Sequence, residues 1–83
     1  MSGTGTIIRL FTVPGCGKCR ALKASIEARG WTCQEVNVAG SFGALREMVR
    51  LSGAREVPVA VVGDAVVVGP DVAALDRLLE KRT

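Results

Sequence analysis

A pair of cysteines three residues apart constrains this chain more than any other feature. Cys16 and Cys19 follow an apolar, β-branched run over residues 6–13 and a Pro14–Gly15 turn, and they open a stretch with helical periodicity. This spacing lets one thiolate attack a disulfide while the second thiol later attacks the first. In a small protein, a cysteine pair placed between a strand and a helix indicates a dithiol redox site.

A structural zinc site is the main alternative for such a pair. Zinc in proteins usually takes four ligands, drawn from two cysteine pairs or from one pair and histidines. The chain has no histidine, and its third cysteine, Cys33, is distant in sequence. We therefore expect no metal and no bound cofactor. For Cys33 we expect a buried, unreactive thiol, with a regulatory thiol as the alternative.

Length and charge limit the classes of function. The 83 residues are expected to form one domain, 1–83, and to act as a monomer. The net charge is +3, but the basic residues are scattered and aromatic residues make up only 4 %, so a nucleic-acid surface is not expected. The most apolar stretch, 57–68, is interrupted and too short to cross a membrane. Without a recognisable signal peptide, a reducing cytoplasm is expected, where such a pair is more often catalytic than structural.

The apolar periodicity predicts strands and helices in alternation. Gly63–Asp64 separates two β-branched runs and predicts a short hairpin turn, while Asp71 can cap a final helix. The predicted elements cover residues 6–13, 17–30, 31–38, 42–52, 57–62, 65–68 and the segment after Asp71.

This order defines the fold class. The first strand–helix–strand unit must be parallel and right-handed, and the hairpin adds an antiparallel half. Helices then cover both faces of a four-stranded mixed sheet. The prediction is an α/β protein with the order β-α-β-α-β-β-α, which is the minimal thioredoxin-like fold.

The chain resembles the glutaredoxin family over almost its whole length. The resemblance rests on three segments in the family's order and spacing: Thr12–Cys19 with the motif Cys16-Gly17-Lys18-Cys19, Val57-Pro58-Val59, and Gly69-Pro70-Asp71. Residues 33–38 and 58–64 look most like NrdH-type redoxins, which pass electrons from thioredoxin reductase to a ribonucleotide reductase. Those proteins also carry a Trp-Ser-Gly-Phe-Arg-Pro-like segment, which this chain lacks, so that partner is not supported.

Roles for individual residues follow from the motif and the resemblance. Cys16 would be the nucleophile, because a helix N-terminus favours a thiolate, and Lys18 would add positive charge. Cys19, on the core-facing side of the helix, would resolve the mixed disulfide. The resemblance implies a cis Val57–Pro58 bond and substrate contacts from residues of three loops: Pro14, Gly15, Val57, Pro58, Gly69 and Asp71.

Two departures from the family concern the reductant. Glutathione-using relatives commonly carry a Lys or Arg where this chain has Val13. They also bind the tripeptide's carboxylate through backbone N–H groups near Pro70, which has no N–H. We therefore expect protein disulfides as substrates and thioredoxin reductase, rather than glutathione, as the reductant. The alternatives are a glutathione-dependent glutaredoxin, an iron–sulfur carrier, which Gly17 would allow, and an adaptor without turnover.

Overall fold

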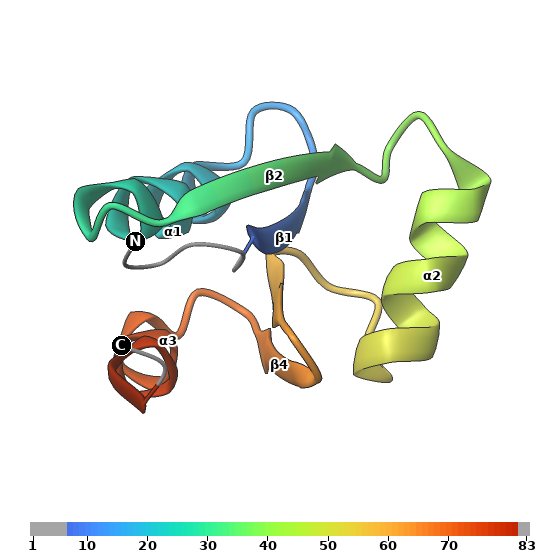
Figure 1. Ribbon diagram of the computed structural model, residues 1–83. Helices are drawn as coiled ribbons and strands as arrows, with labels where there is room; N and C mark the ends of the chain where they lie inside the picture. The colour runs from blue at the N-terminus through green and yellow to red at the C-terminus, as the bar shows by residue number, and fades with distance from the viewer. Residues whose placement is uncertain (1–6, 82–83) are drawn as a thin grey trace.

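The computed structural model describes residues 7–81, in which strands and helices follow the predicted order (Figure 1). Within this range, none of the helices has the length and apolar character needed to cross a membrane. The elements are β1 (Ile7–Thr12), α1 (Gly17–Ala28), β2 (Thr32–Asn37), α2 (Phe42–Ser52), β3 (Val59–Val62), β4 (Ala65–Val68) and α3 (Val72–Lys81).

Most predicted boundaries are confirmed, and the exceptions have local causes. The helix predicted over 17–30 ends at Ala28, because Gly30 takes a left-handed turn with φ of 79°. The strand predicted from 57 begins at Val59, since Pro58 has no N–H for the ladder. The strand predicted over 31–38 is one residue shorter at each end, and the strand predicted to end at residue 13 ends at Thr12, just before the Pro14–Gly15 turn. The predicted start of the first strand, residue 6, lies outside the described residues.

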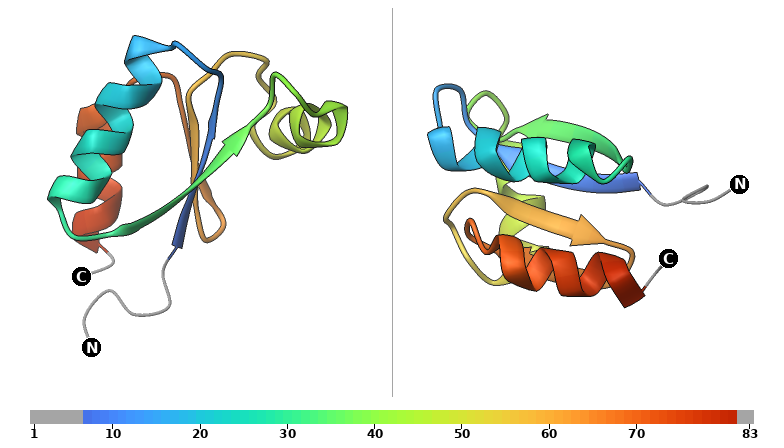
Figure 2. Two further views of the ribbon diagram at one scale, coloured as in Figure 1. Left: turned by 90° about the horizontal axis from the view of Figure 1, so that it is seen from above. Right: turned by 90° about the vertical axis from the view of Figure 1, so that its left-hand side faces the viewer.

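The sheet has the strand order β2-β1-β3-β4, with β1 parallel to β2 and antiparallel to β3. Phe11 of β1 pairs with Val59 of β3, and Val59 pairs with Val68 of β4. The chain segments that follow β1, precede β3 and follow β4 therefore meet at one end of the sheet. Figure 2 shows these three loops together at that end.

Helices cover both faces of the sheet, as predicted: α1 and α3 lie on one face and α2 lies on the other (Figure 2). Side chains alternate along β1, so that Leu10 packs towards α1 and α3 whereas Phe11 packs towards α2. The larger cluster of buried residues contains Ile8, Leu10, Leu22, Ile26, Trp31, Ala60, Val62, Val67, Leu75 and Leu79. The smaller one contains Phe11, Val38, Met48, Val59 and Val61.

Local sequence signals fix the ends of α2, and a long-range ion pair attaches the helix to the sheet. The Ser41 hydroxyl accepts the N–H of Ala44 at 3.1 Å, which caps the first turn. Gly53 ends the helix in a left-handed conformation with φ of 73°. The guanidinium of Arg9 on β1 donates two hydrogen bonds, of 2.7 and 3.0 Å, to the Glu47 carboxylate on α2.

Candidate functional site

Cys16 lies at the junction between the loop after β1 and the start of α1. Gly15 takes φ of 78°, a left-handed conformation that suits glycine, and turns the chain into the helix. Cys16 is the N-cap residue of α1, and its sulfur accepts the N–H of Cys19 at 3.3 Å. Its side chain is half-buried, and it is a free thiol, as are Cys19 and Cys33. The helix therefore directs backbone N–H groups at a thiol that solvent can reach.

These donors lower the pKa of Cys16. The largest cause is the hydrogen bond from the Cys19 side chain, followed by the hydrogen bond from the Cys19 N–H. The Lys18 N–H and, last, the Lys18 charge also favour the thiolate. The structure thus gives the Lys18 charge a smaller effect than the hydrogen bonds at the helix N-terminus.

Cys19 occupies the inner side of α1, next to Leu22 and Ile26, and its side chain is 3 % exposed. This confirms the predicted core-facing position. Burial raises the pKa of Cys19 to about 11, with smaller contributions from its hydrogen bond to Cys16 and from the charges of Cys16 and Glu35. At neutral pH, Cys16 therefore ionises in preference to Cys19.

A polar group behind the cysteine pair was not predicted. Thr12, which is buried, donates its hydroxyl hydrogen to Glu35 at 2.9 Å, and Lys23 donates to the other carboxylate oxygen at 3.1 Å. The hydrogen bond from Lys23, and then that from Thr12, lower the pKa of Glu35. Its negative charge disfavours the Cys19 thiolate. The signal in the sequence that could have indicated this group is Glu35, a charged residue within a predicted strand.

Cys33, also on β2, is only partly as predicted. It is half-buried rather than buried, and it packs against the larger core cluster. Burial is the main cause that raises its pKa. No described group of three or more His, Cys, Asp or Glu residues could hold a metal ion.

The loops before β3 and before α3 are joined by a hydrogen bond. The Val57–Pro58 bond is cis, as predicted, and Pro58 is buried. The Gly69 N–H donates to the Pro58 carbonyl oxygen at 2.8 Å. Asp71 accepts the N–H of Ala74 at 3.0 Å and so caps α3. The two loops therefore form one surface beside the start of α1.

Sequence-predicted site residues meet at this end of the sheet, and a hollow extends from it. Pro14 and Gly15 are exposed beside Cys16. Val13 and Val57 line a hollow of about 560 Å³ that continues towards the start of α2. The hollow's other lining residues, which were not predicted, are Val38, Ala39, Gly40, Ser41, Phe42, Leu45 and Arg55.

Comparisons with known proteins agree with this geometry. A family model described as glutaredoxin matches residues 8–67. An uncharacterised glutaredoxin-like 8.6 kDa protein of the rubredoxin operon of Clostridium pasteurianum is 31 % identical over 75 residues, which cover 90 % of this chain and all of that protein.

Solved structures of related proteins have the same fold. The glutaredoxin-like NrdH-redoxin from Escherichia coli superposes with a TM-score of 0.75 at 32 % identity, covering 87 % of this chain and 93 % of that one. A glutaredoxin from Archaeoglobus fulgidus gives 0.80 at 19 % identity, with 87 % and 84 % covered. The chain belongs to the glutaredoxin family, as a thiol redox protein with the cysteine pair Cys16 and Cys19.

Proposed function

We propose that this protein is a dithiol oxidoreductase that reduces disulfide bonds of other proteins in a reducing compartment. Cys16 is the nucleophile and Cys19 is the resolving thiol. Pro14, Gly15, Val57, Pro58, Gly69 and Asp71 form the surface against which the substrate lies. The observation that carries the proposal is the contrast between a half-buried Cys16 that accepts a helix N–H and a Cys19 that is 3 % exposed.

The reaction proceeds in two exchange steps. The Cys16 thiolate attacks one sulfur of the substrate disulfide, so that a mixed disulfide forms and the other substrate sulfur leaves as a thiolate. Cys19 then loses its proton and attacks the Cys16 sulfur, which releases the second substrate thiolate. Two electrons pass from the cysteine pair to the substrate, and a Cys16–Cys19 disulfide remains. Burial delays ionisation of Cys19, which favours attack by Cys16 first.

A flavoenzyme such as thioredoxin reductase is the proposed source of electrons. Several backbone groups near α3 are unsuited to holding a glutathione carboxylate. Pro70 has no N–H, while the N–H groups of Gly69 and Val72 already donate to the carbonyl oxygens of Pro58 and Pro70. Val13 adds no positive charge beside Cys16. The NrdH-redoxin of Escherichia coli is described as having a thioredoxin-like activity profile, which supports the same choice.

The proposal is tested by oxidation of NADPH coupled to reduction of insulin. One reaction contains thioredoxin reductase, and the other contains glutathione with glutathione reductase. We expect turnover with thioredoxin reductase and little with glutathione. Turnover with glutathione alone would overturn the proposed reductant, and a lack of turnover with either would count against disulfide reduction. The Cys33→Ser variant is the control and should keep full activity.

A further inference from the structure

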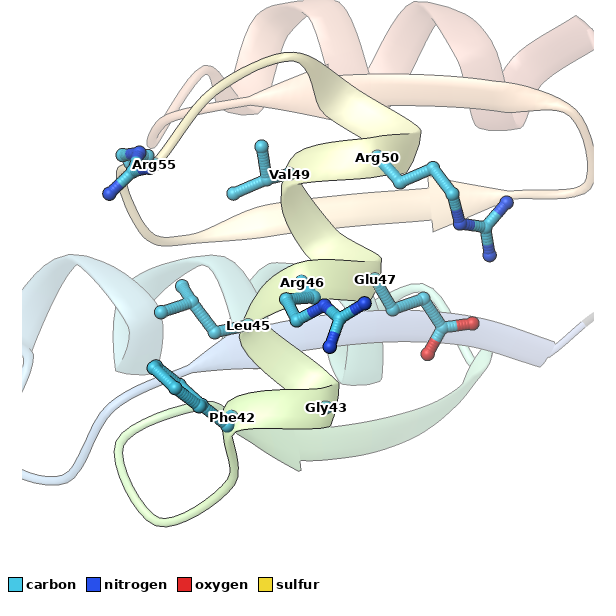
Figure 3. A pocket seen from close by; sticks show the side chains of 8 residues that line it. All are labelled: Phe42, Gly43, Leu45, Arg46, Glu47, Val49, Arg50 and Arg55. Atoms are coloured by element: carbon cyan, nitrogen blue, oxygen red, sulfur yellow. The ribbon is translucent and has the colours of Figure 1, made fainter.

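An open groove of about 790 Å³ lies along the exposed side of α2 (Figure 3). Phe42, Leu45 and Val49 follow the helical repeat, and their side chains project to the same side of the helix. Phe42 is 81 % exposed, whereas Leu45 and Val49 are half-buried. Single exposed apolar residues are common on proteins, but these three form a continuous strip.

Three arginines border this apolar strip: Arg46, Arg50 and Arg55. All three are exposed, and none forms a salt bridge with any residue in the described range 7–81. The one acidic residue in the lining, Glu47, is bound by Arg9 at 2.7 Å and also lies within electrostatic range of Arg50. The groove therefore combines an apolar strip with a net positive charge, because three arginines face a single carboxylate in the lining.

The groove continues towards the cysteine pair. The hollow beside the redox site shares Phe42, Leu45 and Arg55 with the groove, and at its other end it reaches Val13 and Val57. Val13 is in the loop that leads to Cys16, and Val57 precedes the buried Pro58. A polypeptide whose cysteine reacts with Cys16 can therefore extend over this hollow and onto α2.

We propose that the groove over α2 binds an extended acidic segment next to the reactive disulfide of the substrate protein. This inference rests on the proposed function and adds the class of substrate. A large apolar side chain of the segment packs against Phe42, and its carboxylates pair with Arg46, Arg50 and Arg55. Arginine suits this role, because its planar guanidinium forms two hydrogen bonds with one carboxylate. Complementary charge also speeds the encounter of the two proteins.

Two other occupants fit the groove less well. A nucleic acid would use phosphate contacts and stacked aromatic rings, whereas the lining has one aromatic ring, Phe42, within an aliphatic strip. A second copy of the chain would bring the same three arginines to a symmetric interface, where like charges repel.

The test uses two synthetic disulfide peptides that differ only beside the cysteine, with Leu-Glu-Glu-Glu in one and Leu-Gln-Gln-Gln in the other. Reduced protein is mixed with each peptide, and the second-order rate constant of reduction is measured. Dithiodipyridine, a small neutral disulfide, reports the reactivity of the cysteine pair alone. We expect the acidic peptide to react roughly tenfold faster at low salt, because several exposed ion pairs add. Added KCl should reduce this difference.

Matched variants test whether the difference in rate between the two peptides arises at the groove over α2. Arg46→Gln should slow the acidic peptide roughly two- to fivefold, which corresponds to one exposed ion pair. Its control is Arg77→Gln, which removes an exposed charge from α3 on the other face. Phe42→Thr should slow both peptides roughly fivefold or more through lost apolar contact. Its control is Ile7→Thr, because Ile7 is 53 % exposed at the far end of β1.

Each outcome decides between the proposals. Suppose that all variants reduce dithiodipyridine. If both peptides then react at equal rates, or if Arg46→Gln and Arg77→Gln have equal effects, docking is overturned while the proposed function stands. If the wild-type protein does not reduce dithiodipyridine, the proposed function fails.

Docking is also measured without chemistry, by NMR titration of the Cys16→Ser protein with the acidic peptide carrying Ser for Cys. Shifts at the Phe42, Arg46 and Arg55 amides support docking, and unchanged amides overturn it. Docking is equally overturned if a single-stranded oligonucleotide binds these amides more tightly, or if Phe42 is buried in a dimer.

Discussion

At the scale of single residues, the two cysteines of the motif differ most in their surroundings. Cys16 accepts an N–H from the first turn of α1 and is within reach of solvent, while Cys19 lies against the core. The pKa of Cys16 is lowered, and the pKa of Cys19 is raised to about 11. The proposed chemical order of the two thiols rests on this difference, because the thiolate is the attacking species.

Alkylation by iodoacetamide, followed site by site with mass spectrometry, should reveal this order. As the pH rises, we expect Cys16 to be labelled first, because the hydrogen bonds from Cys19 lower its pKa. Cys19 and Cys33 should be labelled later, because burial raises the pKa of both. Labelling of Cys19 before Cys16 would contradict the proposed roles.

The raised pKa of Cys19 should also affect stability. An unfolded cysteine ionises near 9.0 and folded Cys19 near 11, so the unfolded state loses its proton first as the pH rises. The stability contributed by Cys19 should fall between these pH values, by on the order of 3 kcal/mol.

Urea unfolding of the wild-type and Cys19→Ala proteins across this pH range measures the effect, with Ile26→Val, which changes a buried side chain of the same helix that does not titrate, as the control. The difference in unfolding free energy between wild type and Cys19→Ala should shrink as the pH rises. A difference that is independent of pH would show that Cys19 is not held in its neutral form.

At the scale of elements, Asp71 at the start of α3 has a structural role as a helix cap and a proposed role in substrate binding. Asp71 accepts the Ala74 N–H, so Asp71→Ala should destabilise the protein by about 1 kcal/mol. Asp71→Asn keeps an acceptor and should restore most of that stability. Both are measured by urea unfolding beside insulin reduction. If Asp71→Asn restores stability but not insulin reduction, the carboxylate also contacts the substrate. If Asp71→Asn restores both stability and insulin reduction, the role of Asp71 is capping alone.

The attachment of α2 to the sheet can be tested in the same way. Met48 is fully buried between α2 and the strands, within the smaller core cluster. Met48→Ala should lower the free energy of unfolding by about 2–5 kcal/mol, because it removes buried volume. Met48→Leu, which nearly conserves volume, should cost less than about 1.5 kcal/mol. Equal effects of the two variants would mean that packing at this position does not secure α2.

At the scale of the whole molecule, the sheet register assembles the site from three distant parts of the chain. The pairing of Phe11 with Val59, and of Val59 with Val68, brings three loops to one end of the sheet. The Gly69–Pro58 hydrogen bond then joins two of them. The cysteine pair is thus local in sequence, while the surface around it depends on the fold.

This distinction explains what the sequence could predict. The element order, the Cys16 position at a helix start and the cap at Asp71 depend on local patterns, and all three were predicted. The cap at Ser41 is a local feature of the same kind. The Arg9–Glu47 pair joins residues 38 apart, and the Thr12–Glu35 bond joins residues 23 apart. Such contacts require the strand register and the helix placement, which periodicity alone does not give.

The most direct test of the account is to capture the covalent intermediate. Cys19→Ser and Cys16→Ser proteins, each also carrying Cys33→Ser, are reduced and mixed with oxidised insulin, and the products are weighed by intact mass spectrometry. The account predicts a stable mixed disulfide at Cys16 in the Cys19→Ser protein, released by dithiothreitol, and none in the Cys16→Ser protein. An adduct that forms only in the Cys16→Ser protein would contradict the assignment of nucleophile and resolving thiol.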